Sequence, residues 1–144
     1  MKRILTLIII FSWLTPIYAR EMISLKEYLI LNENDNSDAV NAYVSKRCSA
    51  TFLVVAKIFG DNTLENKKVF DQMVIKGSDL MPAAATIEAN SNNRNVNQVI
   101  YEVRDQIEIM VDNLMQISDE SYAKTGVYLT PHVEDLTLCN SIFD

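Results

Sequence analysis

Apolar residues recur three or four positions apart along most of the chain, which is the period of an amphipathic helix. The clearest case is a series whose members lie alternately four and three residues apart: Val96, Ile100, Val103, Ile107, Met110, Leu114 and Ile117. This seam is typical of a helix that packs on its neighbours at a shallow angle. We expect the helix to continue to Lys124 and to stop at Thr125-Gly126, because glycine commonly follows a helix end.

A second long helix is predicted over 38–59 and ends before Gly60. Its apolar stripe consists of Val40, Val44, Cys48, Phe52, Val55 and Phe59. The run 51–56 is also apolar and β-branched enough for a buried strand. We favour the helix, because the chain has no second run of that kind with which such a strand could pair.

Capping-box spacings mark the start of two further helices. Ser24 and Glu27 predict a short helix from Leu25 to Leu31. Asn62 and Glu65 predict the start of a longer helix, whose inward residues would be Val69, Phe70, Met73, Val74, Leu80, Met81, Ala84 and Ile87.

Gly77 and Pro82 interrupt that longer helix, so a kink or a break into two helices is predicted near them. Thr130-Pro131 opens the last predicted helix, with proline at its first helical position. Its inward stripe consists of His132, Leu136, Cys139 and Phe143. The sequence therefore predicts an all-α fold, a small helical bundle of about four principal helices plus a short N-terminal one.

The N-terminus, 1–19, is predicted to be a cleavable signal peptide. Lys2-Arg3 form its positive start, Ile4–Leu14 its apolar stretch, and Pro16 breaks the helix before the small residue Ala19. An uncleaved membrane anchor is the alternative. We favour cleavage, because the apolar run is shorter than the roughly 20 residues that a bilayer needs.

Cleavage would leave 20–144 as one helical domain, exported to the periplasm or secreted, with no stable membrane anchor. Both cysteines, Cys48 and Cys139, lie in this exported part. An oxidising compartment favours a disulfide between them over two buried free thiols. It would close a loop of roughly ninety residues and stabilise the fold by about 4–5 kcal/mol in the chain-entropy model.

The formal net charge of −6 falls to about −8 once the two cations of the signal are removed. Phosphate backbones repel such an acidic chain, so nucleic acid is a poor partner.

The sequence lacks the motifs of the common catalytic and cofactor-binding sites. The chain has one histidine, His132, and no C-x-x-C-H, G-x-S-x-G or phosphate-binding glycine loop. We therefore expect no metal site, no cofactor and no catalytic residue. The acidic row Glu102, Asp105, Glu108 and Asp112 lies mainly away from the apolar seam, where carboxylates are solvated.

One group of residues indicates recognition. Tyr122, Tyr128, Leu129 and His132 surround a glycine-containing loop between two rigid helices, where contact residues are common. The alternative, which we favour, is that Tyr128 and Leu129 plug the end of the bundle against water.

The outline of signal, acidic helical domain and single disulfide resembles many small exported helical proteins. These include inhibitors and immunity proteins that block toxins in the bacterial envelope. The likeness is one of class, so it implies a non-enzymatic role in binding another protein and no particular functional residue. A carrier of a small apolar ligand, in the bundle interior or near Gly77 and Pro82, is the alternative function, and an enzyme with an unfamiliar site is a third.

Both covalent predictions are tested by one intact-mass measurement on protein recovered from the exporting cell. The mass is expected to lack 1–19, and to rise by two hydrogens when a reductant is added. An unchanged mass on reduction, or a leader still attached, would contradict the assigned compartment.

Overall fold

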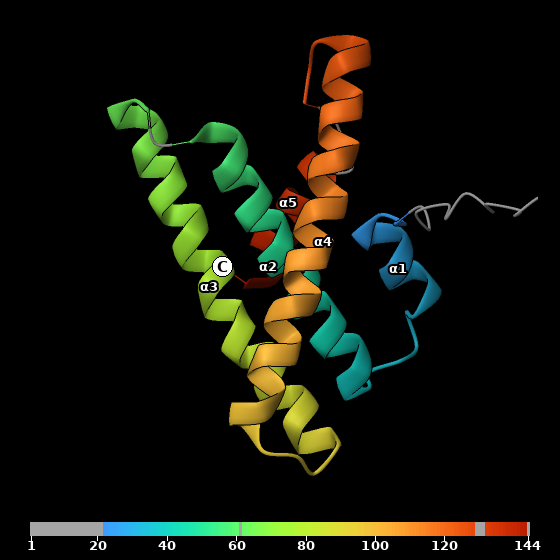
Figure 1. The fold of residues 1–144 in the computed structure, drawn as a ribbon. Helices are drawn as coiled ribbons and strands as arrows, with labels where there is room; N and C mark the ends of the chain where they lie inside the picture. Colours follow the sequence, from blue (N-terminus) through green and yellow to red (C-terminus); the bar gives the residue numbers. More distant parts are fainter. Residues whose placement is uncertain (1–21, 61, 129–131, 144) are drawn as a thin grey trace, which may run out of the picture.

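The helix α2 (Asp38–Phe59) forms the centre of the fold (Figure 1). Every residue from Val44 to Phe52 is buried, including polar residues on what would otherwise be its solvent side. A helix buried all round needs neighbours on all sides. The computed structural model describes residues 22–60, 62–128 and 132–143, and nothing is described of the His132 side chain.

Three helices supply those neighbours: α3 (Leu64–Ser91), α4 (Val96–Thr125) and α5 (His132–Phe143) each pack on α2. A short helix, α1 (Leu25–Leu31), packs on α5. Regular structure in the described residues is entirely helical, which confirms the predicted all-α bundle. The helix that we favoured over a strand for 51–56 is confirmed, because these residues lie within α2.

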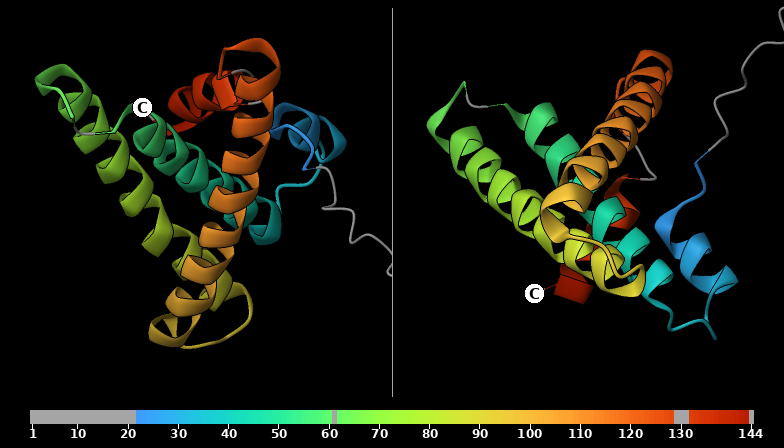
Figure 2. Two further views of the ribbon diagram at one scale, coloured as in Figure 1. Left: turned by 45° about the horizontal axis from the view of Figure 1, so that its top comes forward. Right: turned by 60° about the horizontal axis from the view of Figure 1, so that its bottom comes forward.

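α2 and α3 run side by side as an antiparallel hairpin, and α4 returns from the far end of α3 (Figure 2). α3 and α4 meet at the 92–95 turn and diverge upward from it, so that their other ends stand apart (Figure 1). α5 lies on the opposite side of α2 from α4.

The helix ends follow local chemistry. Ser24 and Ser37 accept hydrogen bonds from the backbone N–H groups of Glu27 and Val40, as N-caps do. The predicted cap of α3 is one residue early: Thr63 accepts from the Asn66 N–H at 3.1 Å. Gly126 ends α4 in the left-handed conformation, with φ of 72°, as expected for a residue without a Cβ.

Of the two predicted alternatives, a kink or a break into two helices, the break is wrong, because α3 is continuous through Gly77 and Pro82. Gly77 instead lies where α3 packs closely on α2. Its carbonyl accepts a hydrogen bond from the Ser49 hydroxyl at 2.6 Å, and a Cβ added to it would lie 2.8 Å from Leu53 Cγ. The glycine is therefore used for tight helix packing.

The buried core has two parts. The first joins α2, α3 and α4 and contains Ala50, Val54, Ala84, Ala85, Ala89, Val99, Val103, Ile107, Val111 and Leu114. The predicted α4 seam is thus partly correct: Val103, Ile107 and Leu114 are buried, whereas Val96, Ile100 and Met110 are half-buried at its edge. The second part joins α1, α2, α3 and α5 around Leu25, Val40, Val44, Cys48, Phe52, Leu80 and Cys139.

Two neighbouring residues of α2 hold α5 in place. Cys48 forms the predicted disulfide with Cys139, with 5.4 Å between the Cα atoms. Arg47 donates to Asp135 from Nε at 2.9 Å and from Nη2 at 2.6 Å. Asp135 also accepts from the N–H of Leu25 at 2.9 Å, so one buried carboxylate ties α1, α2 and α5 together.

No helix in the described ranges is long and apolar enough to cross a membrane.

Asp135→Ala is expected to lower the free energy of unfolding by about 3–5 kcal/mol, because it leaves the fully buried Arg47 cation without its counter-charge. Urea unfolding monitored by circular dichroism measures this loss. The control is Glu134→Ala, one residue away and exposed, which should cost less than about 1 kcal/mol. Equal losses in the two variants would contradict a structural role for the buried pair.

Gly77→Ala is expected to destabilise the protein by about 1–2 kcal/mol, although alanine is the better helix former. The new methyl group would overlap Leu53, and overpacking of this kind outweighs the gain in propensity. Thermal and urea unfolding compare this variant with Ser78→Ala, the exposed neighbour, which should lose no stability. A stabilised Gly77→Ala variant would contradict the close contact.

Candidate binding site

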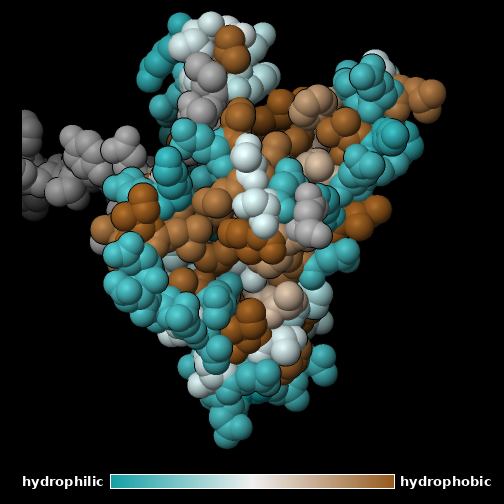
Figure 3. Space-filling view, turned by 180° about the vertical axis from the view of Figure 1, so that it is seen from behind, coloured by the Kyte–Doolittle hydropathy of each residue, from teal (hydrophilic) through white to brown (hydrophobic). Residues whose placement is uncertain are grey.

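A small apolar pocket opens at the end of the bundle where α3 and α4 stand apart. Its volume is about 120 Å³. We call it the apolar pocket, and it is lined by Val55, Ile58, Phe59, Tyr128, Val133 and Leu136. Several of these side chains remain exposed: Phe59 by 45 %, Tyr128 by 41 % and Val133 by 53 %. From behind, apolar side chains gather between the ends of α3 and α4 (Figure 3).

The wall from α2 forms because its last turns extend beyond the part of the helix that is covered on every side. Val55 is buried, but Ile58 is half-buried and Phe59 is exposed. Gly60 then ends the helix with φ of 65°. The apolar side chains of α2 therefore continue beyond the turns that the other helices cover. These uncovered side chains form one wall of the pocket.

The wall from α5 depends on the buried ion pair. Asp135 points to Arg47 on α2, whereas Val133 and Leu136, on either side of it in sequence, line the apolar pocket. A helix places such residues on different sides of its axis. Holding Asp135 inside the fold therefore fixes the direction in which Val133 and Leu136 point.

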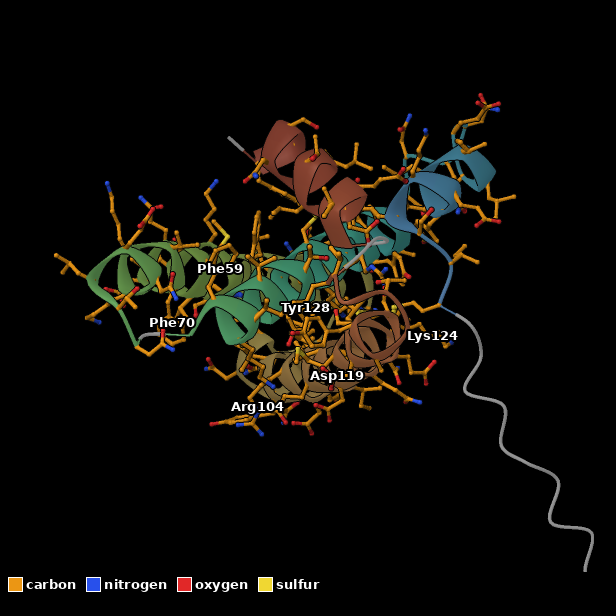
Figure 4. All side chains as sticks on the ribbon, turned by 90° about the horizontal axis from the view of Figure 1, so that it is seen from above. Phe59, Phe70, Arg104, Asp119, Lys124 and Tyr128 are labelled. Carbon is orange, nitrogen blue, oxygen red and sulfur yellow. A yellow bond between two sulfur atoms is a disulfide. The ribbon has the colours of Figure 1, made fainter. Side chains whose placement is uncertain are left out.

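The third wall is Tyr128, in the link that follows α4. Its ring stacks on that of Tyr122, with centroids 4.5 Å apart and an interplanar angle of 17°. The Thr125 hydroxyl bridges the turn, accepting from the N–H of Val127 at 3.3 Å and lying 3.2 Å from its carbonyl oxygen. In the view from above, Tyr128 lies between α2 and α4 (Figure 4).

Of the four predicted contact residues, the structure brings together two, Tyr122 and Tyr128. Leu129 lies outside the described residues, and His132 is the first residue of α5. The pocket residues Val55, Ile58, Phe59, Val133 and Leu136 were missed as a surface. Their spacing is that of core positions, and periodicity alone cannot distinguish a covered apolar residue from an uncovered one.

Two members of the acidic row on α4, Glu102 and Asp105, pair with arginines at the surface. Glu102 is exposed and accepts from Arg94 Nη1 at 2.8 Å, and this hydrogen bond lowers the pKa of its carboxyl. A general acid at neutral pH needs a raised pKa. Asp105 pairs with Arg104 at 3.0 Å.

The buried polar groups are used to join helices. Lys46 of α2 forms an ion pair with Glu88 of α3 and donates to Gln106 of α4 at 2.6 Å. Burial raises the pKa of Tyr43, which stays protonated against Tyr28, with ring centroids 4.0 Å apart.

Among the described side chains, no three His, Cys, Asp or Glu residues cluster as metal ligands would.

Comparisons with protein-family models, with curated proteins and with solved structures found no match to this chain.

Proposed function

We propose that this chain is an exported, non-enzymatic protein that acts by binding another protein through the apolar pocket. The observation that carries the proposal is an apolar hollow whose rim side chains Phe59, Tyr128 and Val133 stay about half exposed. An apolar cavity that rigid helices hold open to solvent is typical of a docking site for a partner's anchor residue.

The size of the pocket favours a partner protein over a small-molecule carrier. Ligand sites usually enclose about 300–1,000 Å³. The pocket measures about 120 Å³, which is less than half of the lower limit. An engineered cavity of about 150 Å³ holds one benzene, so the apolar pocket accepts one side chain of similar size.

The proposed location is the periplasm or the cell exterior, after removal of 1–19. The buried Cys48–Cys139 disulfide supports it, because structural disulfides form and persist in oxidising compartments.

The experiment is affinity capture from the exported fraction of the source cells, with three baits: the unaltered protein, Val133→Asn and Ile109→Asn. Both substitutions change an exposed β-branched residue on a helix without altering the charge. Val133 lines the apolar pocket, whereas Ile109, 62 % exposed, lies elsewhere on α4. A specific partner should be retained by Ile109→Asn and reduced at least about tenfold by Val133→Asn, as for a contact near the centre of an interface.

Equal capture by the two variants would contradict the role of the pocket. Native mass spectrometry of the same preparations distinguishes the proposed binding of a partner protein from the alternative role as a carrier. A small molecule that co-purifies with the unaltered protein and is absent from Val133→Asn would overturn the proposal in favour of a carrier.

A further inference from the structure

The two parts of the buried core use different helices. Every buried residue of the first part lies on α2, α3 or α4. The second part holds α1 and α5 against the other helices and contains both cysteines. From above, α1 and α5 lie together on one side of α2, with α4 on the other side (Figure 4). The three-helix part of the molecule therefore has a core of its own, whereas the second core exists only while α1 and α5 are attached.

α5 buries few side chains. Among its described side chains only Asp135 and Cys139 are buried, while Leu136 and Leu138 are half-buried. α5 has 12 residues, and isolated helices of fewer than about 12–15 residues are at best marginally stable in water. The position of α5, and its helical state, therefore depend on the two residues through which it is attached.

The non-covalent links of α5 are weak in net terms. The Arg47–Asp135 pair takes two charges out of water, and this desolvation offsets much of their attraction. Arg47 Nη1 is also buried without a hydrogen-bond partner among the described residues, which adds to the cost. Lys76 of α3 donates to Asn140 at 2.8 Å, a single hydrogen bond of small net value. The Cys48–Cys139 bond is therefore the strongest of these attachments.

α1 depends on α5 in turn. It has seven residues, of which only Leu25 is buried, and it packs on α5. The N–H of Leu25 donates to Asp135 of α5 at 2.9 Å. Without α5, Leu25 would lose this acceptor, and the contact of Tyr28 with Tyr43 would have to hold a helix too short to be stable alone. We expect α1 to detach together with α5.

The apolar pocket is also built on α5. Val133 and Leu136 are two of its lining residues, and Tyr128 lies in the link that leads to α5. Detachment of α5 would remove one wall completely and leave the exposed end of α2 without the surface that faces it. The pocket therefore exists only in the molecule in which α5 is attached.

We propose that the Cys48–Cys139 disulfide is a latch that assembles the apolar pocket. In the reduced chain, α1 and α5 are detached, α2, α3 and α4 remain folded, and the pocket is absent. Formation of the bond attaches α5 and completes the pocket. This inference rests on the proposed function and adds its regulation: the chain binds its partner only after export to an oxidising compartment.

The oxidant is a disulfide of another molecule. In the reduced chain, Cys48 lies on the side of α2 that α5 has left uncovered, so its thiolate can attack a sulfur of that disulfide. This attack gives a mixed disulfide and releases one thiol of the oxidant. Attack by Cys139 on the sulfur of Cys48 then releases the second thiol. The two cysteines lose two electrons and two protons in all, and the oxidant gains them.

The latch is expected to stay closed once it has formed. Both cysteines are 0 % exposed in the closed structure. Thiol–disulfide exchange requires a thiolate to reach one of the sulfur atoms, so a reductant has to wait until α5 opens. The bond therefore acts as a switch that is used once, on export.

The test is amide hydrogen exchange measured by mass spectrometry on three forms of the protein. These are the disulfide-bonded protein, the same protein reduced in urea and refolded with a dithiol, and Cys48→Ala/Cys139→Ala. The reduced protein keeps both sulfur atoms, so an effect shared with the double variant is due to the missing bond and not to altered packing. The double variant with and without the dithiol controls for the reagent.

In both forms without the bond, α1 and α5 are expected to exchange at least about tenfold faster than in the disulfide-bonded protein, because they open as one unit. Exchange in the buried segments of α2 and α4 should change by less than about twofold, because their core does not use α1 or α5. Cys48→Ala/Cys139→Ala is also added as a bait in the capture experiment. Its yield of a partner that depends on Val133 should fall at least about tenfold, as with Val133→Asn.

Unchanged exchange in α5 would overturn the latch, because α5 would then be held without the bond. Equal acceleration in α2, α3 and α4 would also overturn it, because the bond would then stabilise the whole fold. Undiminished capture by the double cysteine variant would overturn the regulation of the pocket. The proposed function itself falls only if capture is the same for Val133→Asn and Ile109→Asn, and the exchange measurement decides on the latch in that case too.

Discussion

The attachment of α5 to α2 is the constraint on which the rest of the structure depends. Two consecutive residues of α2, Arg47 and Cys48, bind Asp135 and Cys139, which are one helical turn apart on α5. One bond is ionic and the other covalent. Together they fix both the position of α5 and its rotation about its own axis, which a disulfide alone would leave less defined.

That rotation determines what the molecule presents to solvent. With Asp135 and Cys139 turned inward, Val133 and Leu136 meet the last turns of α2 and form the apolar pocket. A buried ion pair gives little net stability over an apolar core, but it is strongly destabilising when one partner is lost. Any rotation of α5 that moves Asp135 away would therefore leave the Arg47 cation buried without its partner, which disfavours other arrangements of α5.

Much of the fold was predictable from local patterns. The bounds of α1 and α2, the end of α4 at Gly126 and the disulfide all follow from signals within a few residues or from the cysteine count. The expected interruption of α3 at Gly77 and Pro82 failed as a break into two helices, because α3 is continuous through both residues. The missing side chain of Gly77 instead makes room for Leu53 of α2, a contact that local sequence does not reveal.

The candidate site, like the fold, was predictable from the sequence only in part. The sequence by itself determined α1, α2 and the end of α4, the cap at Ser24, the pairing of the two cysteines and the aromatic residues beside the α4 end. Each of these depends on neighbours along the chain or on a unique pair. Only the tertiary structure decided that Arg47 is buried and that Phe59 and Val133 stay open. Burial depends on which segment covers a residue, and the partner of Arg47 lies 88 residues away in sequence.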